Sequence, residues 1–148
     1  MASIELRPAE AGDEKAIAAL LERSGLSAEG IAPHLAHFMV AVERGAVVGT
    51  AGCEVHGNVG LLRSFAVDVA LRGQGVGASL YREVVARAQT AGVQDCYLLT
   101  DTAEGFFATF GFRRVSRDAV PQAIRDTDQF RIQCLPTSIC MGKSLGPN

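Results

Sequence analysis

LLRSFAVDVALRGQGVGASLY, residues 61–81, is the stretch that decides the fold. Its first part is a β-rich apolar run, and from Leu80 onward apolar residues take up helical spacing. Between them stand Gly73, Gly75 and Gly77, which predict a tight loop at the start of a helix. Free backbone N–H groups and the helix dipole at such an N-terminus favour a bound phosphate. We therefore predict a strand, a phosphate-binding loop and a helix in that order.

Several interpretations of these glycines compete with a plain turn that binds nothing. The P-loop pattern GxxxxGK[ST] is absent. Gly73, Gly75 and Ala78 satisfy the loose dinucleotide pattern GxGxx[G/A], but that fingerprint belongs to the first unit of a complete nucleotide domain, and this loop lies mid-chain. Arg72, Gly75 and Gly77 also fit [Q/R]xxGx[G/A], which resembles the pyrophosphate loop of the GNAT superfamily of acetyl-CoA-dependent N-acetyltransferases.

Composition limits the classes of protein that this chain can form. With 148 residues and 48% hydrophobic content, it predicts one domain with a full core over residues 1–148. A net charge of -2 and the lack of a basic block argue against nucleic acid or an anionic membrane as the main partner. MASIELRPAE has no apolar signal region, and no apolar run approaches the roughly 18 residues of a membrane span, so we expect a soluble cytoplasmic protein.

The segments before the loop predict a helix followed by an antiparallel meander. A helix between Asp13 and a cap at Gly25 carries one apolar stripe. Residues 27–37 are ambiguous, because Pro33 breaks any long helix. Arg44-Gly45 is a hairpin signal between two apolar runs. The predicted strands are residues 3–7, 38–42 and 47–55, with a further turn at Gly57-Asn58 before the central strand.

The segments after the loop predict a crossover unit. Residues 79–91 are amphipathic and end at Gly92, and residues 96–100, CYLLT, predict a short buried strand. A strand, a helix and a strand connected in this way form a right-handed βαβ unit with parallel strands. AEGFFATFGF, residues 103–112, then predicts a short helix that carries three phenylalanines and stops at Gly111.

This last element resembles the acetyltransferase element written FYxxxGF. Its order and separation from the glycine loop make the combined resemblance to the GNAT superfamily specific, and the resemblance covers residues 3–115. It implies an α+β fold, with a central mixed, mostly antiparallel sheet flanked by helices. It also implies an acetyl-CoA-dependent N-acetyltransferase that acts on a small-molecule amine. Dimers are common for this fold, so a homodimer is a further expectation.

The resemblance also implies which residues hold acetyl-CoA, and it implies no metal. Backbone groups at a bulge in the central strand would hold the pantetheine arm and donate to the developing oxyanion. The glycine loop would hold the pyrophosphate. The implied set is Phe65, Ala66, Val67, Arg72, Gly73, Gln74, Gly75, Val76, Gly77 and Phe107.

Two positions depart from the family pattern. Many members carry a tyrosine that protonates the departing thiolate where this chain has Phe107, and a common asparagine is replaced by Thr100. A phenylalanine cannot donate a proton, so another group or water must do so, or the step does not control the rate. These losses leave a second function open, a non-catalytic acetyl-CoA or metalloid sensor on the same fold.

Direct acyl transfer requires a neutral amine, so a base is expected where strand ends converge on the cleft. The chain offers Glu54, His56, Asp101 and Glu104. Glu54 is the first choice, because strand alternation projects it from one sheet face, and a solvated strand carboxylate is its plain alternative. His56 also serves, since imidazole titrates near neutral pH, although a histidine beside a turn is commonly a surface residue.

Arg63 is the most informative residue for the substrate. It stands inside the apolar run LLRSFAV, and a buried unpaired guanidinium is prohibitively costly. Facing the cleft, it would bind an anionic group of the acceptor in bidentate fashion. The alternative is a structural ion pair with an acidic residue of the chain, and the sequence favours neither.

The C-terminal region resembles a narrower group. AVPQAIRDT, residues 119–127, predicts a helix, and residues 139–143 predict an edge strand. Together with LLRSFAV, RGQGVG and YLLTDTAEGFFATFGF, the tail segments AVPQAIRDTDQF and CLPTSICM resemble the arsenic-resistance subgroup of GNAT proteins. Membership implies a role beside arsenic detoxification, such as acetylation of an organoarsenical or another amino acid-like compound.

The cysteines carry a separate expectation. Cys53, Cys96, Cys134 and Cys140 show no CxxC pairing, and scattered cysteines in a cytosolic chain usually stay reduced. Cys134 and Cys140 either bind trivalent arsenic, which prefers thiolate ligands, or are small apolar core residues.

Overall fold

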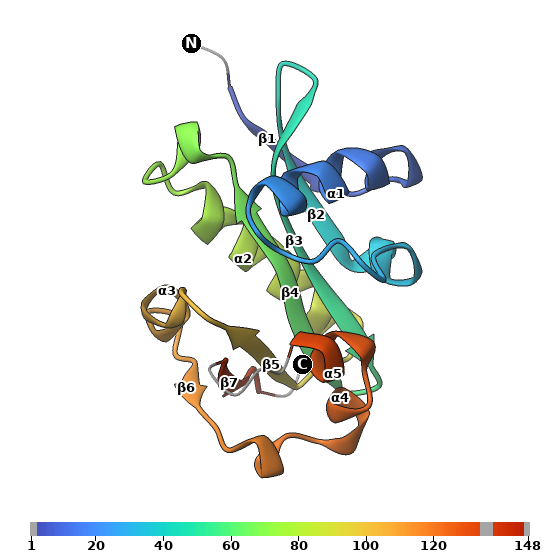
Figure 1. Ribbon diagram of the computed structural model, residues 1–148, viewed down its shortest axis with the longest axis vertical. Helices are drawn as coiled ribbons and strands as arrows, with labels where there is room; N and C mark the ends of the chain where they lie inside the picture. Colours follow the sequence, from blue (N-terminus) through green and yellow to red (C-terminus); the bar gives the residue numbers. More distant parts are fainter. Residues whose placement is uncertain (1–2, 134–137, 147–148) are drawn as a thin grey trace.

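The fold is built on a mixed sheet of seven strands in the order β1-β2-β3-β4-β5-β7-β6 (Figure 1). The computed structural model describes residues 3–133 and 138–146. One neighbouring pair, β4 with β5, is parallel, and the others are antiparallel. The strands are β1 (Glu5–Pro8), β2 (Phe38–Glu43), β3 (Ala46–His56), β4 (Val59–Val67), β5 (Asp95–Thr100), β6 (Arg113–Arg114) and β7 (Ile139–Ser144). The α+β fold class expected from the sequence is confirmed.

Short turns produce the antiparallel half of the sheet. Arg44 and Gly45 have φ of 52° and 77°, the left-handed conformation that a two-residue hairpin loop needs between β2 and β3. Gly57 has φ of 68° in the turn between β3 and β4. Both turns lie where the sequence predicts them.

The crossover from β4 through α2 (Val76–Thr90) to β5 confirms the predicted parallel unit. The two strands pair only from Val59 to Leu61 on β4 and from Asp95 to Tyr97 on β5. Beyond these residues they spread apart (Figure 1). The sheet therefore contains a gap that opens toward the carboxyl ends of β4 and β5.

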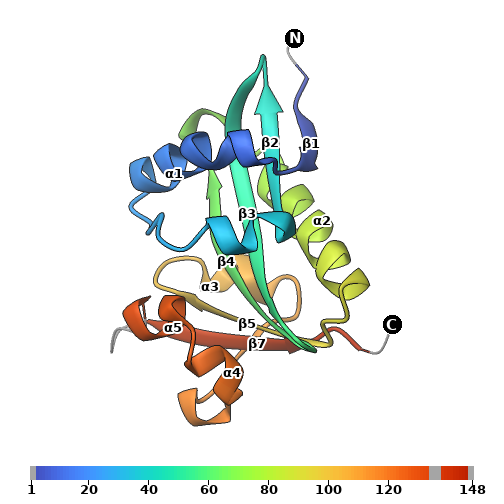
Figure 2. The ribbon, with the colours of Figure 1, turned by 90° about the vertical axis from the view of Figure 1, so that its right-hand side faces the viewer.

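Helices cover both faces of the sheet (Figure 2). α2 packs on one face, and its buried Leu80, Val84 and Ala88 belong to a core cluster there. The opposite face is covered by α1 (Glu14–Arg23), the 3-10 helix η2 (Ala32–His37), α4 (Gln122–Arg125) and α5 (Asp128–Gln133). Two smaller clusters on that face contain Ile17 of α1 and Ile124 of α4. Strand alternation thus places Leu61 and Leu62 of β4 in different cores.

The C-terminal region differs from its prediction in two ways. The helix predicted over residues 119–127 is shortened to α4, because Pro121 stands at its N-cap with extended backbone. β7 is not an edge strand, since the two-residue β6 pairs with its outer side. The remaining short helices are η1 (Ala11–Asp13), η3 (Val69–Leu71), α3 (Glu104–Ala108) and η4 (Arg117–Ala119).

Two of the described cysteines, Cys53 and Cys96, are free thiols. Cys53, Cys96 and Cys140 are buried, and Cys140 packs with Leu61 and Phe130 in an apolar cluster. Cys134 lies outside the described residues, so the arsenic-binding alternative for Cys134 and Cys140 stays a prediction. Within 3–133 and 138–146, the longest apolar helices fall short of what a membrane crossing requires.

The close contact of Gly52 with Phe38 yields a prediction about stability. A Cβ at Gly52 would lie 2.3 to 2.5 Å from atoms of the fully buried Phe38 ring. We expect Gly52→Ala to lower the free energy of unfolding by about 1–3 kcal/mol, because the ring must leave its packed position. Gly12→Ala is the control, since a Cβ there meets nothing within 4 Å. Urea unfolding with equal losses for both variants would contradict the packing argument.

Candidate functional site

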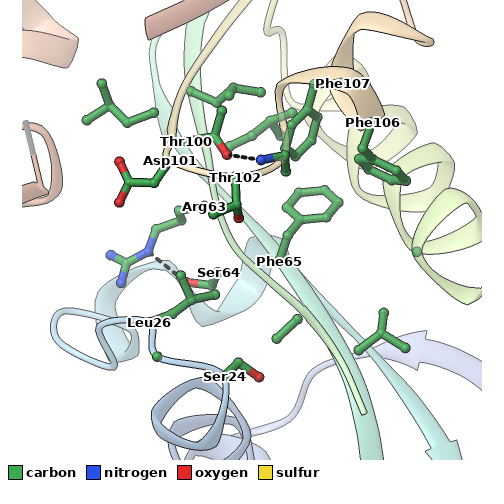
Figure 3. A pocket seen from close by; sticks show the side chains of 18 of the residues that line it. Ser24, Leu26, Arg63, Ser64, Phe65, Thr100, Asp101, Thr102, Phe106 and Phe107 are labelled. Atoms are coloured by element: carbon green, nitrogen blue, oxygen red, sulfur yellow. Dashed lines mark hydrogen bonds between the residues drawn. The ribbon is translucent and has the colours of Figure 1, made fainter. Parts of the chain in front are cut away.

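A cavity of about 780 Å³ occupies the gap between β4 and β5 (Figure 3). On the α2 side its lining includes residues 71–73 and 75–78 with Phe106 and Phe107. On the opposite side it includes residues 24–27 between α1 and η2, together with Gln129 and Ser138. Because one cavity is lined from both faces, the gap connects the two faces of the sheet.

The glycine loop forms the entrance on the α2 side. Gly75 is the N-cap of α2 with φ of 83°, and Gly73 has φ of 84°, so both need the conformation that glycine adopts freely. A Cβ at either position meets nothing within 4 Å, which leaves room directly above the first turn of α2. The N–H groups of that turn have no partner within the helix. The loop therefore fits a pyrophosphate group.

The residues predicted to hold acetyl-CoA all line the cavity except Gln74. Gln74 Nε2 instead donates to the carbonyl oxygen of Ala70 at 3.5 Å. Arg72 is exposed and lines the cavity, and its Nε donates to the carbonyl oxygen of Val67 at 3.2 Å. The assignment of these residues to acetyl-CoA stays a prediction.

The predicted bulge lies in β4 beside the cavity. Thr50 of β3 faces Ala66, but Gly52 faces Arg63, so β4 carries one extra residue. Ser64 accommodates it with φ of 61°, an uncommon conformation for a residue with a side chain. Beyond Leu61, β4 has no paired neighbour on its β5 side among the described residues. Backbone groups of residues 65–67 that point away from β3 are thus available to a ligand in the gap, except the Val67 carbonyl oxygen, which accepts from Arg72.

An aromatic cluster lines the cavity beside the glycine loop. The Phe107 ring is buried and stands edge-on to Phe65 and Phe106, with ring centroids 5.2 and 5.0 Å away. Thr100 Oγ1 accepts a hydrogen bond from Ala103 N at 2.9 Å, which fixes the turn before α3. Phe107 therefore supplies apolar surface, and no proton donor replaces the missing tyrosine at its position.

Arg63 forms a buried ion pair on the opposite side of the sheet. Its Nη1 lies 2.8 Å from Glu54 Oε2, and the two side chains are 2% and 5% exposed. Nε donates to Ser64 Oγ, while Nη1 and Nη2 donate to the carbonyl oxygens of Gly30 and Glu29. This is the structural alternative stated for Arg63 from the sequence. One N–H on Nη2 has no partner among the described residues, so a contact with the acceptor stays a prediction.

Two histidines complete the surroundings of Glu54. Glu54 Oε1 lies 3.2 Å from His56 Nε2 and 3.4 Å from His34 Nε2. Burial lowers the pKa of His34, and nearby His56, Arg63 and His37 lower it further, while the Glu54 carboxylate opposes the shift. His34 comes from η2, in the stretch that the sequence leaves ambiguous, and no pattern there marks it.

The four candidate bases occupy different environments. Glu54 and His56 lie behind Arg63 and do not line the cavity. Glu104 is paired with Arg114 at the surface. Asp101 does line the cavity, directly after β5. The described residues contain no group of three or more acidic, histidine or cysteine side chains arranged to hold a metal ion.

Comparison with known proteins identifies the family. A family model described as an acetyltransferase (GNAT) domain matches residues 34–114. This chain belongs to the GNAT acetyltransferase family. The match includes the glycine loop and the FYxxxGF-like element, and it confirms the resemblance inferred from them. The GNAT chain is accordingly an N-acetyltransferase.

Relatives support the same family. An uncharacterized N-acetyltransferase of Chlorobaculum tepidum is 30% identical over 80% of this chain and 77% of its own length. The amino-acid acetyltransferase of Neisseria meningitidis is 27% identical over 84% of this chain, which spans 30% of that enzyme. N-acetylglutamate synthase from Neisseria gonorrhoeae, solved with coenzyme A and N-acetyl-glutamate, superposes with a TM-score of 0.82 at 24% identity, over 98% of this chain and 36% of that one. The arsenic-resistance subgroup is not supported by these relatives and stays a prediction.

The buried ion pair predicts a large loss of stability when it is broken. Arg63→Ala leaves Glu54 buried without its main partner, so we expect the free energy of unfolding to fall by about 3–5 kcal/mol. Arg114→Ala is the matched control, because it breaks a pair whose side chains are 67% and 35% exposed and solvent replaces the lost contact. Thermal and urea unfolding measure both variants. An Arg63→Ala protein as stable as the control would show that the pairing is not structural.

Proposed function

We propose that this GNAT protein transfers the acetyl group of acetyl-CoA to the amine of a small, amino acid-like acceptor that carries an anionic group. The observation that carries the proposal is the single cavity through the sheet, which the glycine loop lines on one face and Arg63 on the other. A cofactor and an acceptor that enter from opposite faces would meet in the gap between β4 and β5.

On the cofactor side, the proposed contacts to acetyl-CoA come mainly from backbone groups. The first turn of α2 and the glycines before it would bind the pyrophosphate, and residues 65–67 would bind the pantetheine arm along the unpaired edge of β4. Acetyl-CoA supplies the acetyl group as a thioester. N–H groups at the bulge would donate to the carbonyl oxygen as negative charge develops on it. Phe65 and Phe107 would supply apolar surface beside the thioester.

On the acceptor side, the proposed binding site is formed by Arg63 and by the loop whose backbone Arg63 binds. Two carbonyl oxygens of residues 29 and 30 accept from the guanidinium, so Arg63 fixes the chain that follows the lining residues 24–27. Its remaining N–H would bond a carboxylate or another oxyanion of the acceptor. The relative named amino-acid acetyltransferase supports an acceptor of this chemistry. An amino acid-like organoarsenical falls within the same class.

Proton transfer follows from the groups that the cavity contains. The reaction forms a C–N bond and breaks the C–S bond, and the ammonium loses two protons, one to the sulfur and one to bulk water. Phe107 cannot supply the sulfur with a proton, so water does. Glu54 would act by holding Arg63, and direct proton transfer to Glu54 or His56 would require a path of water around the guanidinium.

The alternative from the sequence, a non-catalytic sensor, would be favoured by a closed second cleft. The cavity instead reaches Arg63 and residues 24–27 on the far face. This connection favours the enzyme.

An acceptor screen tests the proposal. The full chain is incubated with acetyl-CoA and single amines, namely L-amino acids, their α-carboxamides, simple alkylamines and amino acid-like organoarsenicals, and thiol release and product mass are measured. We expect kcat/KM at least about tenfold higher for an acceptor with an anionic group than for its uncharged amide. Equal rates for simple alkylamines would refute the anionic acceptor. Binding of coenzyme A without acetylation of any amine would favour the sensor.

The glycine loop yields a prediction with a closely matched control. Gly75→Val and Gly45→Val introduce the same side chain at φ of 83° and 77°, and a Cβ at either position meets nothing within 4 Å. We expect similar backbone strain, of about 1–2 kcal/mol, in both variants. Only the side chain at 75 would occupy the space above α2, so coenzyme A affinity should fall at least about tenfold for Gly75→Val alone. Calorimetry with unchanged affinity for Gly75→Val would refute the loop assignment.

A further inference from the structure

Asp101 and Ser138 form a fixed polar pair at the end of the gap. Thr100, the last residue of β5, is paired with Ile139 of β7, so Asp101 and Ser138 occupy the next position on these two strands. Ser138 Oγ donates to Asp101 Oδ1 at 3.0 Å. Ser138 is 7% exposed, and Arg117 Nη2 donates to its carbonyl oxygen at 2.9 Å. The Ser138 hydroxyl therefore belongs to a buried residue whose own carbonyl oxygen is hydrogen-bonded, and it orients the Asp101 carboxylate.

The pair lies on the acceptor face. On β5, Tyr97 and Leu99 pack with the cluster beneath α4, and strand alternation places Asp101 on the same side. Figure 3 shows the Asp101 carboxylate on the side of the cavity where the Arg63 guanidinium lies. Among the described residues that line the cavity, Asp101 is the one acidic side chain. Its Oδ2 has no partner in the described part of the chain.

We infer that Asp101 binds the ammonium group of the acceptor and takes up one of its protons, and that Ser138 positions the Asp101 carboxylate. The inference rests on the proposed function and adds the orientation of the acceptor in the cavity. Its amine would lie on the β5 side, and its anionic group would lie on the β4 side. Asp101 attracts the ammonium, accepts the proton that must leave before the C–N bond forms, and passes that proton to bulk water at the exposed mouth. The acceptor class is a compact zwitterion.

The test compares Asp101→Asn, Asp101→Glu and Ser138→Ala with the wild type. The acceptors are the L-amino acid that the wild type acetylates fastest and its α-carboxamide. We expect Asp101→Asn to lower kcat/KM at least about thirtyfold for both acceptors, because both carry the amine, with the dissociation constant of coenzyme A unchanged. Asp101→Glu should recover part of the activity. Asp118→Asn, an exposed acid outside the cavity, is the control and should match the wild type.

Ser138→Ala separates positioning from folding. We expect a three- to tenfold rise in the acceptor KM with little change in the unfolding midpoint, and Ser138→Thr should keep the hydroxyl and most of the activity. An active wild type with an Asp101→Asn variant of unchanged kcat/KM would overturn the inference while the proposed function stands. A loss confined to the amino acid and absent for its amide would also overturn it, because Asp101 would then act on the anionic end. A wild type that acetylates no amine would overturn both the proposed function and the inference about Asp101.

Discussion

The short pairing of β4 with β5 is the constraint on which the rest of this structure depends. Parallel strands in a sheet usually bond over their full length, but here the ladder ends at Leu61 and Tyr97. The strands diverge because β4 is drawn toward β3, with which it remains paired as far as Val67, and because the bulge at Ser64 adds twist. The gap exposes a row of backbone donors and acceptors on β4 that would be hydrogen-bonded to a neighbouring strand in an ordinary sheet. A ligand that lies along β4 would replace the missing strand.

An open gap in a sheet needs support on both sides, and the two sides receive it differently. On the α2 face, apolar packing of Phe65, Phe106 and Phe107 fills the space beside the strands. On the other face, the Arg63 and Glu54 pair joins β4 to β3 and to the loop after α1. Replacing a buried ion pair by hydrophobic residues of similar volume is often neutral or stabilising, so stability alone does not account for this pair. The charged pair adds polarity beside the cavity, which an acceptor with an anionic group requires.

The sequence predicts the parts of the fold that depend on local spacing. The glycine loop, the Arg44-Gly45 hairpin and the amphipathic helix between two parallel strands follow from patterns within about twenty residues. The place of β7 does not, because its outer neighbour β6 has two residues and leaves no periodic signal. From the sequence, Glu54 is the first candidate for the base, and Arg63 is either an anion ligand or one half of an ion pair with an unidentified acid. Their pairing depends on a cross-strand register that the bulge shifts, which no single-strand pattern reveals.

The replacement of tyrosine by Phe107 becomes intelligible when the two faces are compared. On the proposed cofactor side the wall is aromatic, so a sulfur that leaves as thiolate would have no side-chain acid at Phe107 and would take its proton from water. A thiolate is a weak enough base to leave before it takes up a proton, so water can protonate the sulfur after the C–S bond breaks. The ammonium, in contrast, cannot attack until it loses a proton, and on the proposed acceptor face Arg63 and Asp101 lie on opposite sides of the gap, while Arg72 lines the cavity at the glycine loop. On this proposal the chain places a carboxylate where the nucleophile must be deprotonated, and apolar packing where the leaving group can depart unprotonated.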